Sequence, residues 1–265
     1  MDISHAVILA LLQGLTEFLP VSSSAHLVLV PVFAGWEDQG LVFDIAVHVG
    51  TLMAVIAYYR HTLATMLSDW LGWLRGAPAT ADSVLVWFVI IGTLPVGVCG
   101  ILMSDGTEQF LRSPRVIAAA TVVFALLLWW ADSMARRSST PNGLSWKVVV
   151  MISVCQAFAL IPGTSRSGIT ITAGLMLGLG RELAARFSFL LSIPVIALAG
   201  IAKIYQVSQV DNEITLDFLL IGVVVSGVTA YLTIGWFIGL LERVGLFPFV
   251  VYRLLLGAVL FWVFV

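Results

Sequence analysis

The chain has 265 residues, of which 60% are hydrophobic and only 11% are charged, and its formal net charge is −2. A soluble domain carries about 25% charged residues, so this composition excludes an ordinary soluble protein and indicates an integral membrane protein. No basic run indicates a nucleic-acid partner, so none is expected, and apolar stretches without polar alternation favour helices over a β-barrel.

In chain order, the first element is an apolar region at residues 3–35 that is interrupted by a polar, proline-containing centre, and residues 147–180 form a second such region. The start at residues 1–5 has no basic n-region, so no removable signal is expected. Six other stretches are long enough to cross a bilayer. They are Leu41–Tyr59, Ser83–Met103, Pro114–Ala131, Leu183–Lys203, Leu216–Leu240 and Phe249–Val265.

The two interrupted regions are predicted to be re-entrant helical hairpins. Each apolar arm has about 10–15 residues, which at 1.5 Å per residue reaches the middle of a bilayer and no further. The irregular backbone between the arms must then line a cavity with protein walls. The competing interpretation counts the arms as ordinary spans; the short arms and Pro31 argue against it.

The two halves of the chain resemble each other. Residues 20–25 (PVSSSA) match 162–167 (PGTSRS), and the segments 43–60 and 114–130 loosely match 187–203 and 248–264. We therefore expect one membrane domain over residues 1–265, built from two repeats, 1–137 and 138–265. Each repeat holds one hairpin and three transmembrane helices. Three crossings are an odd number, so the second repeat is inverted, and inverted repeats place their broken helices near the midplane.

The orientation follows from the basic residues, because cytoplasmic loops are rich in Lys and Arg. With six crossings, the richer side holds eight of them: Arg60, Arg75, Arg136, Arg137, Lys147, Arg181, Arg186 and Arg243. The other side holds Arg112, Arg115 and Lys203, while Arg166 and Arg253 are intramembrane. The predicted location is the cytoplasmic (inner) membrane, with both termini outside and the first hairpin entering from outside.

The second hairpin carries Arg166 among the hydroxyl residues Ser165, Ser167 and Thr170. An arginine at membrane depth costs roughly 2.5–3.5 kcal/mol on insertion scales, so it is expected to face a cavity and to have a partner. Helix-breaking residues free backbone N–H groups, and the side chains add donors, which together suit a phosphate. The alternative is a kinked helix whose arginine pairs with a structural carboxylate.

The first hairpin offers complementary groups. Gln13 and Glu17 share one helical face, and Ser22, Ser23, Ser24 and then His26 follow the helix break. Glu17 could pair with Arg166 or bind Mg²⁺ or Ca²⁺ through oxygen. A structural Glu17–Arg166 ion pair is the alternative. The serines and His26 suggest a nucleophile and a proton carrier.

Other polar and small residues receive weaker interpretations. His48 is expected to make a packing contact, Asp44 is left unassigned, and Cys99 and Cys155 are expected to be free thiols. The glycine-rich stretch Gly222–Gly239 suits either contact with a second subunit in a homodimer or close packing inside the monomer.

The stretch from Gln13 to His26, together with Pro162 to Thr170, resembles the undecaprenyl-diphosphate phosphatase family of bacteria, known for bacitracin resistance. That family has an (E/Q)xxxE motif followed by a serine-rich turn and a His, and later a PGxSRSxxT motif. The second motif is matched fully, and the first has Gln13 at its opening position. Where the family often reads SSTGH, this chain has SSSAH. The resemblance covers essentially the whole chain.

The resemblance implies hydrolysis of undecaprenyl diphosphate, a polyprenyl lipid, to the monophosphate and inorganic phosphate. This reaction recycles the lipid carrier for peptidoglycan synthesis. It also implies a divalent metal and a site that opens to the periplasm or cell exterior. The motif residues carry over as Gln13, Glu17, Ser23, His26, Ser165, Arg166, Ser167 and Thr170. Of these, Gln13 and Glu17 are expected to bind the metal. Whether Ser23, His26 or water attacks is open, and the rival function is a secondary transporter or flippase of prenyl phosphates.

Overall fold

The structure is a computed structural model that describes residues 2–103, 105–111, 113–135, 142–207 and 216–264. Within these residues the secondary structure is helical, and the one β-type contact is an isolated bridge between Asn142 and Leu179. Three basic residues used above to predict the orientation, Arg112, Arg136 and Arg137, lie outside the described residues.

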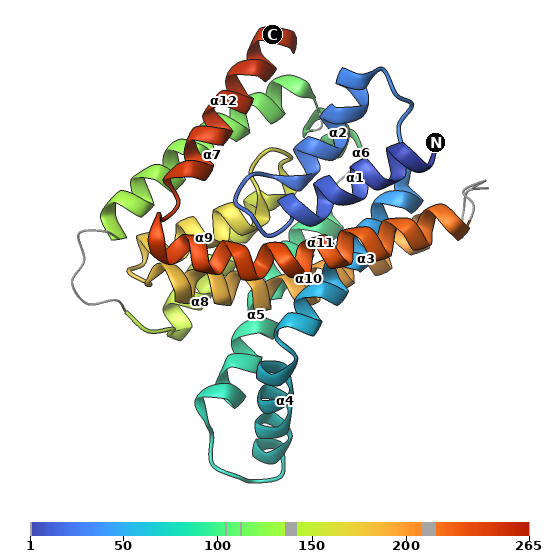
Figure 1. Cartoon of the computed structure of the whole chain (residues 1–265). Helices are drawn as coiled ribbons and strands as arrows, with labels where there is room; N and C mark the ends of the chain where they lie inside the picture. Colours follow the sequence, from blue (N-terminus) through green and yellow to red (C-terminus); the bar gives the residue numbers. More distant parts are fainter. Residues whose placement is uncertain (1, 104, 112, 136–141, 208–215, 265) are drawn as a thin grey trace.

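The helices follow one another along the chain with short connections (Figure 1). The first half contains α1 (Ile3–Thr16), α2 (Ser23–Ala34), α3 (Leu41–Tyr58), α4 (Arg60–Leu74), α5 (Ala81–Leu102), α6 (Asp105–Leu111) and α7 (Pro114–Ala135). The second half contains α8 (Trp146–Gln156), the 3-10 helix η1 (Ala157–Leu160), α9 (Arg166–Met176), α10 (Arg181–Val207), α11 (Leu216–Arg243) and α12 (Phe247–Phe264).

Six helices of the described chain are long and apolar enough to cross a membrane, with mean hydropathies between 1.9 and 2.4. They are α3, α5, α7, α10, α11 and α12, and each overlaps one predicted span with ends that differ by at most four residues. The predicted class, an all-α integral membrane protein, is therefore confirmed at this level. Many of their side chains are exposed and apolar, including Leu94, Ile101 and Trp262, as expected for helices that face lipid.

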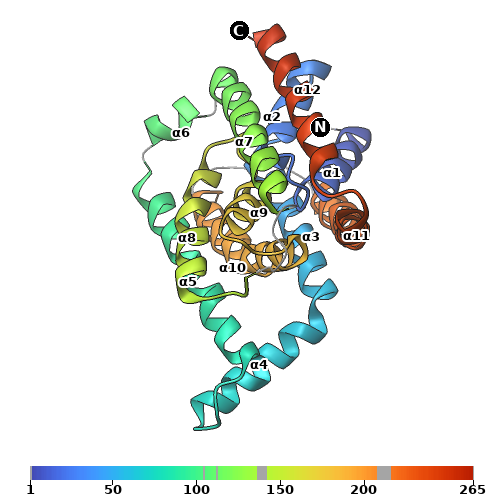
Figure 2. The same ribbon diagram turned by 90° about the vertical axis from the view of Figure 1, so that its left-hand side faces the viewer.

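The interrupted regions form two pairs of short helices, α1 with α2 and α8–η1 with α9. The 14 residues of α1 are about 21 Å long, less than the roughly 30 Å of a hydrocarbon core. In both pairs the chain turns back at the predicted polar centre, at residues 17–22 and 161–165. Figures 1 and 2 show both turns inside the bundle, while α7 and α12 run together along one side. We call these turns the first tip and the second tip.

Two helices have no counterpart among the predicted elements. α4 continues from α3 after Tyr59 and projects from the body of the molecule (Figure 1). It packs on α5 through edge contacts of Trp70 and Trp73 with Trp87. α6 is a seven-residue helix before α7. Both are too short to cross a membrane, so a search for spans passes over them.

Small residues let α1 and α3 lie very close to α11. A Cβ atom on Gly14 would lie 2.6 Å from the carbonyl oxygen of Ser226, and a Cβ on Gly50 would overlap Ser226 Oγ and the carbonyl oxygen of Val223. Ser226 Oγ also donates a hydrogen bond to the carbonyl oxygen of Val47 at 2.9 Å. These contacts hold α1 and α3 against the same helix, α11. Both carry polar groups of the site described below.

The glycine-rich stretch of α11 is used mainly inside the monomer. A Cβ on Gly222 would lie 3.1 Å from the ring of Phe43, and one on Gly235 would lie 3.6 Å from the ring of Tyr58. Gly239, in contrast, has no atom within 4 Å of such a position. Close packing within the monomer therefore accounts for the first part of this stretch, and contact with a second subunit stays a prediction.

We expect Gly50→Ala to lower the melting temperature of the detergent-purified protein, because the new methyl group overlaps α11 backbone and side-chain atoms. Overpacking of this kind costs about 1–3 kcal/mol, sometimes more. Gly239→Ala is the matched control: its methyl group meets no neighbour, and alanine is favoured over glycine in helices by roughly 1 kcal/mol. Equal melting temperatures for the two variants would contradict the packing described here.

Candidate active site

The two tips are joined by hydrogen bonds between residues about 140 positions apart. The backbone N–H of Gly163 donates to Ser22 Oγ at 3.2 Å, and Ser167 Oγ donates to the carbonyl oxygen of Leu19 at 2.9 Å. Broken helices leave backbone groups without intrahelical partners, and in a membrane these groups need partners from the protein. Each tip supplies them to the other.

Both tips end in a serine with unusual backbone geometry. Ser22 precedes α2 with φ of 73°, and Ser165 precedes α9 with φ of 69°; they are the only non-glycine residues with positive φ in the described chain. Such conformations cost of order 1–3 kcal/mol each and cluster at functional sites. Because α2 starts at Ser23 and α9 at Arg166, these two residues occupy the same place in their hairpins. The helix starts therefore pair Ser22 with Ser165, whereas the sequence match pairs Ser22 with Thr164, one residue earlier.

The carboxylate of Glu17 lies where the two tips meet. Its Oε1 accepts from Arg166 Nη2 at 3.2 Å, and its Oε2 accepts from Ser23 Oγ at 2.7 Å and from Gln13 Nε2 at 3.0 Å. Glu17 is 8% exposed and Arg166 is 11% exposed on their side chains. A nearly buried carboxylate is stabilised by an opposite charge and by donors of this kind. The predicted Glu17–Arg166 pair is present.

The guanidinium of Arg166 is held from further sides. Its Nη1 donates to the carbonyl oxygen of Ser188 on α10 at 2.9 Å, and it lies 5.9 Å from the centre of the Phe18 ring. The group therefore cannot swing freely. Since its position is set before any ligand arrives, it is preorganised to bind an anion.

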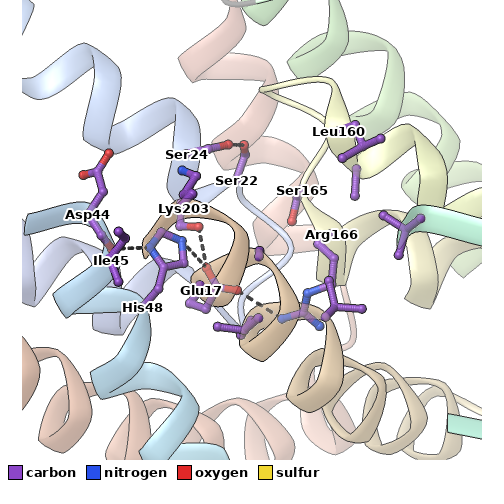
Figure 3. A pocket seen from close by; sticks show the side chains of 17 residues that line it. Glu17, Ser22, Ser24, Asp44, Ile45, His48, Leu160, Ser165, Arg166 and Lys203 are labelled. Carbon is purple, nitrogen blue, oxygen red and sulfur yellow. Dashed lines mark hydrogen bonds and ion pairs between the residues drawn. The ribbon is translucent and has the colours of Figure 1, made fainter. Parts of the chain in front are cut away.

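A cavity of about 200 Å³ opens next to this pair (Figure 3). Among the predicted site residues it is lined by Glu17, Ser22, Ser23, Ser24, Ser165 and Arg166. The remaining lining includes the apolar side chains of Val96, Leu160, Val195, Ile196 and Ala199 and the polar side chains of Asp44, His48 and Lys203. A cavity lined by both polar and apolar side chains suits an amphipathic ligand.

Four predicted site residues, Gln13, His26, Ser167 and Thr170, lie outside this cavity lining. Ser167 and Thr170 are at most 1% exposed, and Thr170 Oγ1 pairs with Ser188 Oγ at 2.7 Å. In this structure both hydroxyls hold α9 in place. His26 uses both ring nitrogens: Nδ1 donates to the carbonyl oxygen of Ser22 at 2.7 Å, and Nε2 pairs with the hydroxyl of Tyr252. His26 therefore links Ser22 of the first tip to Tyr252 of α12.

A different histidine faces the cavity. His48 Nδ1 donates to the carbonyl oxygen of Asp44 at 2.7 Å, which directs Nε2 toward Glu17 Oε2 at 3.9 Å (Figure 3). The sequence analysis expects only a packing contact at this position. Its spacing of four from Asp44 on a helix is a signal that both side chains share one face, but only the tertiary structure brings that face to Glu17.

The donor set was compared with the needs of Mg²⁺ or Ca²⁺. Within the described chain, no group of three or more His, Cys, Asp or Glu residues could hold a metal ion. Gln13 Oε1, however, is buried without a hydrogen-bond partner beside Glu17. Mg²⁺ is commonly held by one or two carboxylates together with substrate phosphates. Glu17 and Gln13 therefore fit a cation that is shared with a phosphorylated ligand.

The formal charges of the cavity bear on the same question. Arg166 and Lys203 carry two positive charges, and Glu17 and Asp44 carry two negative charges, so these four side chains sum to zero. A diphosphate ligand would add at least two negative charges, which a divalent cation would offset.

A second cavity, of about 530 Å³, lies at the opposite ends of α5 and α10 and is lined by Thr80, Asp82, Phe88 and Arg186 among others. It contains none of the predicted site residues.

Comparison with known proteins was made on the whole chain. Residues 6–259 match the family described as "Bacitracin resistance protein BacA". The chain is 54% identical to a protein of Nitrosococcus oceani named undecaprenyl-diphosphatase, with 100% of both chains covered. It is also 54% identical to undecaprenyl-diphosphatase 2 of Stutzerimonas stutzeri, with 100% of this chain and 99% of that protein covered. A protein of Thioalkalivibrio sulfidiphilus, named undecaprenyl-diphosphatase, is 52% identical with 100% of both chains covered. The chain belongs to the bacitracin resistance protein BacA family.

Proposed function

We propose that this protein is a membrane phosphatase that hydrolyses undecaprenyl diphosphate to undecaprenyl phosphate and inorganic phosphate. The family and the names of relatives that match over their whole length support the reaction. The observation that carries the site assignment is the contact of Glu17 with both Ser23 and Arg166 in one cavity at the meeting point of the two tips.

In the proposed mechanism, Ser23 Oγ attacks the terminal phosphorus. The bond from this phosphorus to the bridging oxygen breaks, undecaprenyl phosphate leaves, and the serine proton passes to Glu17 Oε2, which already accepts the hydrogen bond from Ser23 at 2.7 Å. Water then attacks the phosphoserine, inorganic phosphate leaves, and Ser23 recovers its proton from Glu17. Arg166 and Ser165 stabilise the negative charge on the transferred group.

The choice of Ser23 over His26 rests on availability. Both ring nitrogens of His26 already have hydrogen-bond partners and His26 is not among the residues that line the cavity, whereas Ser23 is. Direct attack by water is the remaining alternative, and it predicts no phosphorylated enzyme. Ser167 and Thr170 contribute by fixing the turn that carries Ser165 and Arg166.

A divalent cation, Mg²⁺ or Ca²⁺, is proposed as cofactor, held by Glu17 and by the free amide oxygen of Gln13 together with the diphosphate. When bound, it supplies charge neutralisation for the diphosphate. We expect a chelator to abolish phosphate release by the purified protein and added Mg²⁺ or Ca²⁺ to restore it. Full activity of extensively chelated protein would contradict this cofactor assignment.

The finer architecture is proposed as two inverted repeats in the cytoplasmic membrane, with the cavity open to the periplasm or cell exterior. The order of elements supports it, since each half holds one hairpin followed by three candidate spans. Asp44 at the start of α3 and Lys203 near the end of α10 both line the cavity. The basic-residue rule predicts the outer side for both of these helix ends.

The function is tested by phosphate release from undecaprenyl diphosphate in detergent, with Mg²⁺ present. The proposal expects substrate-dependent release of one phosphate per lipid. A secondary transporter or flippase of prenyl phosphates needs no hydrolysis, so binding of the lipid without phosphate release would favour that alternative.

A further inference from the structure

Arg253 of α12 is a fully buried arginine that the mechanism above does not use. Its side chain is 0% exposed, although α12 is one of the candidate membrane spans. A charged group at membrane depth is costly and normally marks a functional site. Its partners therefore indicate its role.

The guanidinium of Arg253 donates three hydrogen bonds to carbonyl oxygens of three different elements. Nη1 donates to Pro20 of the first tip at 3.3 Å, Nη2 donates to Gly163 of the second tip at 2.7 Å, and Nε donates to Thr121 of α7 at 3.3 Å. In the described chain none of the ion pairs involves Arg253. This differs from Arg166, whose partner is a carboxylate.

Arginine suits three such acceptors because its donors are spread out. A guanidinium carries five N–H donors over a planar group that reaches three separate carbonyl groups, whereas the three N–H donors of lysine lie on one compact ammonium group. The carbonyl groups of Pro20 and Gly163 lie in turns, where the helices are broken and cannot satisfy them. One arginine thus satisfies a backbone group of each tip and sets the distance between them.

The fit around Arg253 is tight on the side of α9. A Cβ atom on Gly168 would lie 2.9 Å from Arg253 Nη1, which is closer than real Cβ atoms come to other atoms. Gly168 lies two residues after Arg166, in the first turn of α9. The absence of a side chain at position 168 therefore leaves room for the Arg253 head group beneath the second tip.

We propose that Arg253 is a positioning residue for catalysis, which holds the two tips in register so that Glu17 and Ser23 of the first meet Arg166 of the second. This role rests on the assignment of those three residues under the proposed function. It makes α12 part of the catalytic machinery although Arg253 does not line the cavity.

The test compares Arg253→Met and Arg253→Lys with the matched control Arg181→Met in the full-length purified protein. Arg181 Nε donates to Asp132 Oδ1 at 2.6 Å, so the control also breaks an interaction between two membrane helices, away from the tips. The melting temperature of each variant is measured, together with kcat per folded molecule and KM for undecaprenyl diphosphate in the presence of Mg²⁺.

Arg253→Met is expected to lower kcat per folded molecule by about 10²-fold, because a misplacement of about 1 Å at a reacting centre has this effect. Arg253→Lys is expected to recover part of the loss, since one ammonium can still reach one or two of the carbonyls. Arg181→Met is expected to lower the melting temperature and to leave kcat per folded molecule unchanged. Gly168→Ala keeps Arg253 but displaces its head group, so it is also expected to lower kcat. If Arg253→Met does not fold, Gly168→Ala is the variant that tests the inference.

Wild-type kcat per folded molecule in Arg253→Met, or in Gly168→Ala if Arg253→Met does not fold, would overturn the inference, as would an equal loss in Arg181→Met. Arg253 would then only stabilise the fold. A Ser23→Ala variant in the same assay separates the two proposals: wild-type kcat in this variant would refute the proposed chemistry, whatever Arg253 does.

Discussion

Arg166→Ala is expected to lower kcat for undecaprenyl diphosphate by about 10²–10³-fold, the usual loss when one preorganised transition-state donor is removed. Arg166 is the cation nearest to Glu17 and is held in place by Ser188 and Phe18 before the substrate binds. Its charge can therefore act on the transferred phosphoryl group without reorganisation. Steady-state phosphate release from the detergent-purified variant measures the loss.

The same substitution leaves Glu17 nearly buried without its counter-charge, and breaking such a pair costs about 3–5 kcal/mol. Activity must therefore be compared below the melting temperature of the variant. Arg181→Ala is the control, because it breaks the other described ion pair of an arginine with a carboxylate, Arg181–Asp132, outside the cavity. We expect a lower melting temperature in both variants and a lower kcat only in Arg166→Ala. Comparable kcat in the two variants would show that Arg166 has no special role.

Ser23→Ala is expected to have the larger effect, a fall in kcat of at least about 10³-fold, because it removes the nucleophile itself. The fold should be kept, since among the described residues the Ser23 side chain hydrogen-bonds to Glu17 alone, and Ser23 lines the cavity. In the wild-type protein, rapid acid quench after mixing with substrate labelled on the terminal phosphate is expected to trap a phosphoserine at position 23.

Ser24→Ala is the matched control for Ser23→Ala. Ser24 also lines the cavity, but its hydroxyl pairs with Ser22 Oγ, at 3.3 Å, and has no hydrogen bond to Glu17 or Arg166 in the described chain. We expect it to retain most of the activity. A Ser23→Ala variant that still releases phosphate rapidly, without any trapped phosphoenzyme in the wild type, would favour direct attack by water. Label on a histidine would favour His26 instead.

The sequence predicts much of the fold because a membrane imposes simple rules. Six spans follow from length and hydropathy, and the short arms of residues 3–35 and 147–180 exclude two complete crossings. Glu17 and Arg166 are predicted as partners because an isolated charge at membrane depth is unstable, so the two had to meet. The contact at 3.2 Å confirms that these two side chains pair.

Other parts of the site depend on tertiary packing that spacing does not reveal. A hydroxyl beside a helix break can either face a ligand or bond to the protein, and its sequence position does not decide between the two. Ser167 and Thr170 match the phosphate motif, yet both are buried, Ser167 against Leu19 and Thr170 against Ser188. His26 is bonded to Ser22 and to Tyr252 of α12 and does not line the cavity. The serines before it favour His26 over His48 in the sequence, and only the tertiary structure places His48 in the cavity lining.

The role of Arg253 could not be read from its neighbours in sequence either. It lies in an apolar helix without an acidic residue nearby, and its acceptors are backbone carbonyls from three separate elements. Helix α4 was passed over for a different reason: it does not need to cross the membrane, and its tryptophans pack on α5.

The central claim is that both tips bind one diphosphate group. It is tested most directly by a structure of the protein with Mg²⁺ and a methylene-bridged analogue of undecaprenyl diphosphate, which cannot be hydrolysed. The account predicts the terminal phosphonate between Ser23 and Arg166, with the cation beside Glu17 and the prenyl chain along the apolar side chains of Val96 and Ile196. A head group bound in the other cavity, near Arg186, with Glu17 and Arg166 still paired and untouched, would contradict it.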